Sequence, residues 1–218
     1  MSLRDGDERL GAWHWVQVLG LAVLVRLLGY SGYFGSDEVT YTEYAFKLAA
    51  GNWAVSDYVG ANRLGVNLPV AAFAWLFGQG EWAAAAYSML CSLLEVALVA
   101  GVGARLVGAR AAWLAALVLA CLPLHAHLAG RMMADAPLAL AMTACFLFFA
   151  RGEHSGRALH YALAGVAAGW SFWIKPHALI YVLVLLSYPL VFRRFNPRWL
   201  WVVGGFAMLV LVNCALFG

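Results

Sequence analysis

The chain has 218 residues, of which 64% are hydrophobic and 11% are charged, and its net charge is +3. A water-soluble domain needs a largely polar surface, so this composition excludes an ordinary soluble protein and predicts an integral membrane protein with several helical spans. The basic residues are spread between apolar runs and form no basic stripe, which excludes nucleic acid as an expected partner.

Seven apolar runs are long enough to cross a bilayer, which takes about 17–25 residues in a helix. These runs are approximately 12–30, 82–104, 111–128, 132–150, 158–174, 176–192 and 199–217. An eighth run, 68–77, is shorter and contains Pro69, so it is either a poor span or a helix lying in the interface. We predict an all-α, polytopic membrane protein with about seven transmembrane helices and short amphipathic, interfacial helices in the first outer loop, residues 31–80.

The distribution of Lys and Arg decides how run 68–77 is read, because inner loops carry the excess of positive charge. If that run does not cross, the inner side carries nine Lys and Arg residues and the outer side carries four; if it crosses, the two numbers exchange. The sequence therefore predicts seven spans with a cytoplasmic N-terminus. In this topology the loops that hold Asp37, Arg63, Asp135 and Lys175 all face outward.

The first outer loop is expected to contain a short helix along the membrane surface. Ser36 or Asp37 would cap its start, and Gly51 follows its end. No repeat or composition change divides the chain, so 1–218 is predicted to be a single module. The chain stops at Gly218 directly after the last run, which suggests a module truncated before a C-terminal part.

Three outward carboxylates are candidates for chemistry. Asp37 and Glu38 follow the first span, and Asp135 begins the fourth. One interpretation is that they complement helix dipoles, which is worth about 0.3–1 kcal/mol each. The other is that they act as a general base or bind a metal ion, since carboxylates from two outer loops could share a proton or a divalent cation. Asp37 and Asp135 are the metal candidates, and a divalent cation is the only cofactor considered.

Outward basic residues accompany these carboxylates: Arg63, Arg131, and Lys175 with His177 in the turn between spans five and six. Taken singly, such cations could extend to the lipid headgroups. Taken together, they predict a phosphate site at the interface, because Arg offers a planar fork of donors and Lys a point charge.

The remaining polar residues carry weaker signals. His125 and His127 would point about 200° apart on a helix, so they are poor joint metal ligands, and we favour an interfacial role. Arg26 and Glu95 lie inside two different spans at depths that differ by more than about 10 Å, so we do not expect them to pair directly.

No nucleotide-binding loop or hydrolase motif is present, which argues against the use of ATP or NAD.

The order of short motifs resembles that of the GT-C membrane glycosyltransferases, in particular the protein O-mannosyltransferase and aminoarabinose-transferase-like group. The motifs are, in chain order, GSDEVTYTEYAFKLAAGNW, NRLGVNLPVAAFAWLFG, ARLVGAR, RMMADAPLALAMTACFLFFARG and GVAAGWSFWIKPHALIYVL. The resemblance covers nearly the whole chain and corresponds to the N-terminal seven-span module of those enzymes.

The resemblance implies a role for each candidate. Asp37, with Glu38 beside it, matches the catalytic carboxylate of the first loop, and Asp135 matches the second outer aspartate. Arg63 matches a basic residue that contacts the donor phosphate, and Lys175 matches a recurrent lysine after span five. In the aminoarabinose-transferase branch that basic residue is a lysine preceded by a glutamate, whereas this chain has Asn62 and Arg63.

The sequence and the resemblance together predict a glycosyltransferase that moves a sugar from a polyprenyl-phosphate donor to an acceptor on the outer, periplasmic face, with inversion. The acceptor is a lipid, a glycan or a protein, and a bacterial inner membrane is the expected location. If the chain is a truncated module, it could lack turnover by itself. The alternative is a non-catalytic membrane protein that binds or moves polyprenyl-phosphate lipids.

Overall fold

A computed structural model describes residues 9–32, 34–35, 37–53, 58, 62–192 and 195–217. Over these residues the secondary structure is helical throughout, with no strand. The chain divides into two compact units, Met1–Leu140 and Ala141–Gly218. Each is described by itself below, and the prediction of a single module over 1–218 stays a prediction. Ser36, the alternative cap of the outer helix, lies outside the described residues. So do Arg4, Arg193 and Arg194, three of the nine Lys and Arg counted on the inner side.

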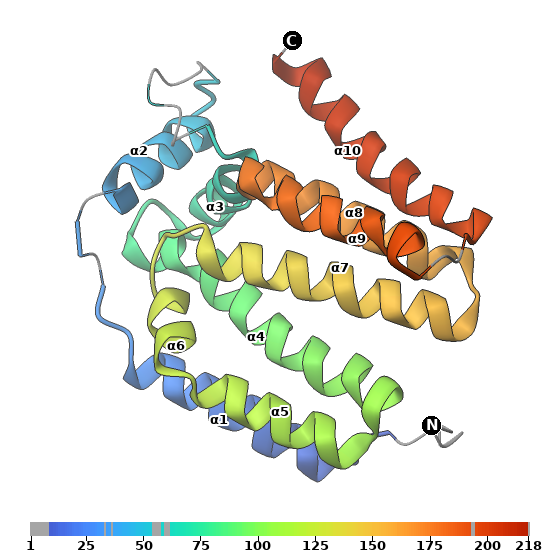
Figure 1. The fold of residues 1–218 in the computed structure, drawn as a ribbon. Helices are drawn as coiled ribbons and strands as arrows, with labels where there is room; N and C mark the ends of the chain where they lie inside the picture. The colour runs from blue at the N-terminus through green and yellow to red at the C-terminus, as the bar shows by residue number, and fades with distance from the viewer. Residues whose placement is uncertain are drawn as a thin grey trace. The chain divides into compact units, whose positions relative to one another are not determined.

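Figure 1 shows the helices, coloured along the chain, and their bounds overlap the apolar runs. The first unit contains α1 (Ala12–Leu28), α2 (Asp37–Ala49), α3 (Leu64–Phe77), α4 (Glu81–Val107), α5 (Ala109–Cys121), α6 (Pro123–Ala129) and the start of α7 (Asp135–Ser155). The second unit contains the rest of α7, then α8 (Ala158–Ile174), η2 (Pro176–Ala178), α9 (Leu179–Phe192), η3 (Pro197–Trp199) and α10 (Leu200–Phe217).

Three of the described helices are long and apolar enough to cross a membrane: Glu81–Val107, Asp135–Ser155 and Pro197–Ala215. The pair α5 and α6 would make a fourth if the two were one bent span. These helices fit an integral membrane protein, while the count of seven spans stays a prediction. The short run 68–77 lies in α3, a helix of 14 residues that contains Pro69.

The helix predicted in the first outer loop is confirmed as α2. It starts at Asp37 and ends at Ala49, and Gly51 follows with a φ of 85°, a backbone conformation that glycine adopts without strain. Glu38, Tyr41, Ala45 and Leu48 are buried. This spacing of three and four residues puts them on one face, which packs against α3.

The core of the first unit is built from small side chains. α4 packs against α1, α3, α5 and α6, and α1 and α5 lie side by side (Figure 1). Small residues let helices approach closely, which favours association inside a membrane. The buried residues at the contact between α1, α4 and α5 are Val18, Ala22, Val96, Ala100, Ala116 and Ala120.

The predicted run 111–128 forms two helices with a bend between them, which leaves open whether it crosses as one bent span. α5 ends at Cys121, and α6 begins at Pro123 at an angle of 63° to it. Proline has no backbone N–H and its ring clashes with the preceding turn, so it starts a helix well and does not continue one. The bend turns His125 and the segment that follows away from the axis of α5.

The second unit is organised around the contact of α8 with α10. A Cβ atom added at Gly205 would lie 2.6 Å from the carbonyl oxygen of Ala162, so only glycine fits there. At the end of α7, Glu153 accepts hydrogen bonds from Tyr161 in α8 and Trp199 in η3, at 2.9 and 2.6 Å. The close glycine contact joins α8 to α10, and the exposed carboxylate of Glu153 ties the end of α7 to α8 and η3.

Candidate active site

Asp37 and Glu38 are adjacent in sequence but face different surroundings. Successive residues of an α-helix are rotated by about 100°, so neighbours at the start of α2 point in different directions. Asp37 is exposed, whereas Glu38 has no exposed surface. The carboxylate available to a substrate is therefore that of Asp37.

Two tyrosine hydroxyls orient the Asp37 carboxylate. Tyr41 donates to Oδ2 at 3.1 Å, and Tyr58 donates to Oδ1 at 3.5 Å. The two tyrosine rings lie parallel with centroids 6.4 Å apart. Sequence reasoning missed both residues, although Tyr41 follows Asp37 by four positions and therefore shares its face of the helix.

Tyr41 also connects Asp37 to Arg63. The Arg63 guanidinium lies over the Tyr41 ring, with Cζ 4.8 Å from the ring centre, an arrangement that attracts a cation to the π face. Burial raises the pKa of Tyr41 to about 12, against the opposing effect of Arg63. Tyr41 therefore stays protonated and remains a hydrogen-bond donor to Asp37 at physiological pH. The structure thus brings together a predicted catalytic carboxylate and a predicted phosphate ligand.

Glu38 is the acceptor of a buried ion pair. Its Oε1 accepts hydrogen bonds from Nε of Arg131 at 2.9 Å, from Nη2 of Arg131, and from the backbone N–H of Phe34 at 3.1 Å. The Arg131 guanidinium also lies over the Phe34 ring, 5.0 Å from its centre. The other oxygen, Oε2, is buried and has no hydrogen-bond partner among the residues that the structure describes. This geometry fits Glu38 and Arg131 as groups that hold the first outer loop to the turn before α7.

Asp135 stands at the first position of α7, half-buried, four residues after Arg131. Pro137 in the same first turn is buried, as expected for proline at a helix start. The turn before it is fixed by Ser88 on α4, which donates to the carbonyl of Met133 at 3.2 Å. Asp135 and Arg131 therefore belong to one turn whose backbone is tied to α4.

Lys175 and His177 belong to the second unit. Lys175 is half-buried, ends α8, and donates its backbone N–H to the carbonyl of Ser171 at 2.9 Å. His177 is exposed in η2. Within 9–32, 34–35, 37–53, 58, 62–192 and 195–217, no group of three or more His, Cys, Asp or Glu side chains could hold a metal ion. Asp37 and Asp135 stay candidates as single carboxylates.

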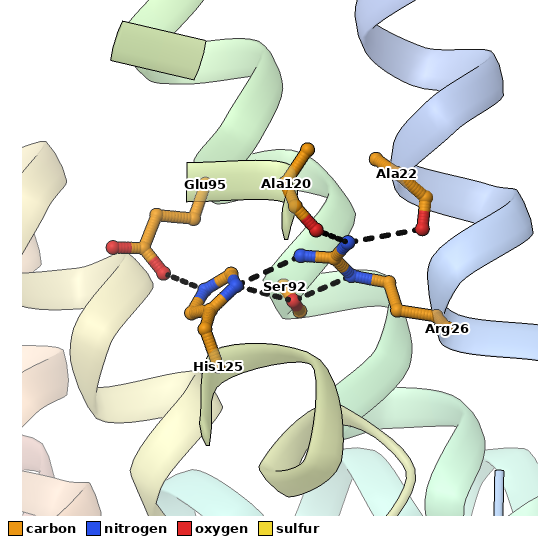
Figure 2. A network of polar contacts seen from close by, with 6 residues as sticks. All are labelled: Ala22, Arg26, Ser92, Glu95, Ala120 and His125. Atoms are coloured by element: carbon orange, nitrogen blue, oxygen red, sulfur yellow. Dashed lines mark hydrogen bonds and ion pairs between the residues drawn. The ribbon is translucent and has the colours of Figure 1, made fainter. Parts of the chain in front are cut away.

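A second polar cluster, which the sequence did not predict, lies among the helices of the first unit (Figure 2). Arg26, which is fully buried, donates from Nη2 to Nδ1 of His125 at 2.8 Å, and Nε2 of His125 lies 2.8 Å from Oε2 of Glu95. Arg26 and Glu95 do not pair directly, as expected, but His125 bridges them. The signal available in the sequence was the proline two residues before His125, which bends the chain at that point.

Known proteins match this chain over most of its length. Residues 64–217 match the family described as dolichyl-phosphate-mannose-protein mannosyltransferase. The undecaprenyl phosphate-alpha-4-amino-4-deoxy-L-arabinose arabinosyl transferase of Edwardsiella ictaluri (strain 93-146) is 27% identical over 221 residues, which cover 96% of this chain and 40% of the relative.

Two crystal structures of ArnT from Cupriavidus metallidurans resemble the fold. The apo form superposes with a TM-score of 0.79 at 24% identity, covering 94% of this chain and 41% of that chain. The form bound to undecaprenyl phosphate gives a TM-score of 0.68 at 23% identity, covering 95% and 43%. The likeness shows the ArnT-like helical fold, and the chain spans about two fifths of the length of these relatives.

Proposed function

Because the chain belongs to the dolichyl-phosphate-mannose-protein mannosyltransferase family, we propose that it is a membrane glycosyltransferase or the catalytic module of one. The sugar donor is a polyprenyl-phosphate-linked sugar, and the acceptor is a lipid, a glycan or a protein. The observation that supports this proposal is that Asp37 and Arg63 both contact Tyr41, because the proposed reaction needs a base and a phosphate-binding cation near the same donor.

The proposed reaction breaks the bond between the anomeric carbon and the phosphate oxygen of the donor. The electron pair of that bond leaves with the phosphate, and Arg63 stabilises the added negative charge. A hydroxyl or amine of the acceptor attacks the anomeric carbon, and Asp37 takes its proton. The hydrogen bonds from Tyr41 and Tyr58 hold the carboxylate in place while the proton moves.

Other candidate residues take supporting roles in this proposal. Arg131 contributes positive potential while it is paired with Glu38. Lys175 and His177, in the second unit, stay phosphate-ligand candidates from the sequence. Asp135 assists Asp37 from the first turn of α7, either with the proton or with a divalent cation.

The proposed location of the reaction is the periplasmic face of a bacterial inner membrane. The excess of Lys and Arg in the loops between later spans puts the N-terminus in the cytoplasm and the loops with Asp37, Arg63 and Asp135 outside. A lipid-linked sugar has its anomeric carbon at the headgroup level, which is where these side chains would then lie.

We expect membranes that contain the chain to consume a polyprenyl-phosphate sugar and to form a product of inverted anomeric configuration. Direct attack opposite the leaving phosphate inverts the reacting carbon. The measurement is incubation with a panel of such donors, chromatography of the remaining lipid, and NMR of the anomeric proton of the product. Retention of configuration would exclude the single displacement. Binding of lipid with no donor consumed would favour a non-catalytic carrier of polyprenyl phosphates.

A further inference from the structure

The cluster of Arg26, His125 and Glu95 has no part in the chemistry proposed above. Its members come from α1, α6 and α4, and Figure 2 shows the His125 ring between the guanidinium and the carboxylate. Ionisable groups inside apolar helices are costly, and a protein that keeps them there uses them for a specific task. The contacts of each member indicate what that task is.

Arg26 closes the end of α5. Its Nη1 donates to the carbonyl oxygen of Ala120 at 3.3 Å, next to the break at Leu122. The last carbonyl groups of a helix lack partners within the helix, and a cation there complements the helix dipole. Further bonds to Ser92 and to the Ala22 carbonyl, at 2.8 and 2.9 Å, fix the guanidinium between α1, α4 and α5.

His125 is held in one tautomer. Arginine carries donors only, so Nδ1 of His125 must accept the hydrogen bond from Arg26. Nε2 then carries the ring proton and donates it to the carboxylate of Glu95. The neutral ring therefore joins a cation and an anion into a bridge without net charge, and the middle member of that bridge belongs to α6.

The segment after α6 leads to the outer site. Residues 130–134 connect α6 to α7 and contain Arg131, whose guanidinium binds the buried carboxylate of Glu38. Glu38 directly follows Asp37 in the first turn of α2. A displacement of α6 would thus move Arg131 and, through Glu38, the start of α2 with Asp37.

We propose that Arg26, His125 and Glu95 are positioning residues for the outer site. Their bridge fixes the short helix α6 against α1 and α4, and so sets the place of Arg131 and of the Asp37 carboxylate. The consequence for turnover rests on the proposed function, whereas the consequence for local structure does not.

The first test measures local structure by hydrogen–deuterium exchange of the full chain in nanodiscs. In His125→Phe, which keeps the ring volume and removes both hydrogen bonds, exchange in 123–134 and 34–41 is expected to rise about tenfold, because local opening there costs less. His125→Gln, whose amide can both accept and donate, is expected to recover part of the protection. If His125→Phe does not fold, Ser92→Ala is the milder variant, with the same direction expected.

Unchanged exchange in these two segments of a folded variant would overturn the proposal. A uniform rise over the whole first unit would also overturn it, because that result means a general loss of stability. Neither outcome depends on catalysis, so a failure of the proposed function leaves this test intact.

The second test is a double-mutant cycle on turnover. Introduced into the wild type, His125→Phe is expected to lower turnover about tenfold. Introduced into Arg131→Gln, it is expected to lower turnover little further, because both substitutions act on Asp37 through Arg131. Tyr161→Phe, which removes the hydrogen bond to Glu153 in the second unit, is the control. Its effect on turnover should be the same in the wild type and in Arg131→Gln. If His125→Phe lowered turnover by the same factor in the wild type and in Arg131→Gln, the result would contradict an effect of His125 that acts through Arg131.

Discussion

Sugar transfer is expected to fall by about 100- to 10,000-fold when Asp37 is replaced by Asn, which is the range that a positioned general base contributes. Asparagine keeps the size of the side chain, and its single amide oxygen can still accept the hydrogen bond from one of the two tyrosines, Tyr41 or Tyr58. It cannot take a proton from the acceptor. Binding of the lipid donor should be unchanged, because the phosphate contacts come from the cations.

Turnover and donor binding are measured on the same preparations of wild type and Asp37→Asn. Glu43→Gln is the matched control, since Glu43 is an exposed carboxylate on the same helix, α2, and has no part in the proposed site. The control should keep normal turnover. Full activity in Asp37→Asn would remove Asp37 as the base, and an equal loss in both variants would point to a general effect of charge near the membrane surface.

Replacing Arg131 with Gln is expected to destabilise the first unit by about 3–5 kcal/mol, because it leaves a buried carboxylate without its counter-charge. Glu38 has no exposed surface, and its Oε1 is bound by Arg131 and the Phe34 N–H. The double variant Glu38→Gln/Arg131→Gln removes both charges, so it should recover most of the lost stability. The measurement is the free energy of unfolding in detergent, obtained from a denaturant titration of each variant.

The control for this prediction is Arg63→Gln. Arg63 is half-buried and contacts the Tyr41 ring, a cation–π contact worth about 0.5–1 kcal/mol at an accessible site. Its replacement should therefore affect stability far less than that of Arg131. Similar losses in both single variants, or no recovery in the double variant, would contradict the assignment of a buried ion pair.

Local sequence signals were sufficient to predict α2, the helix that carries the candidate base Asp37. The Asp-Glu pair after an apolar run and Gly51 beyond it predicted the limits of α2 closely. The sequence did not predict that Asp37 would be exposed and Glu38 buried. Treating Asp37 and Glu38 as one acidic motif ignored the rotation of about 100° between them, which buries one and exposes the other.

The bridge of Arg26, His125 and Glu95 was missed for a different reason. Depths were counted along straight helices, and the hydropathy of run 111–128 is continuous across Leu122 and Pro123, so the bend was not visible in the apolar pattern. The bend of 63° allows His125 to reach both partners. Contacts between distant segments depend on such bends, and a single sequence gives little information about them.

The most direct measurement of the central claim is native mass spectrometry of the purified chain with undecaprenyl phosphate and with undecaprenol, which lacks the phosphate. The account predicts that the wild type binds the phosphate form preferentially, and that Arg63→Ala loses this preference, because a charge-assisted hydrogen bond to phosphate is worth about 1.5–3 kcal/mol. Equal binding of the two lipids by the wild type, or an unchanged preference in Arg63→Ala, would contradict a phosphate-binding site at Arg63.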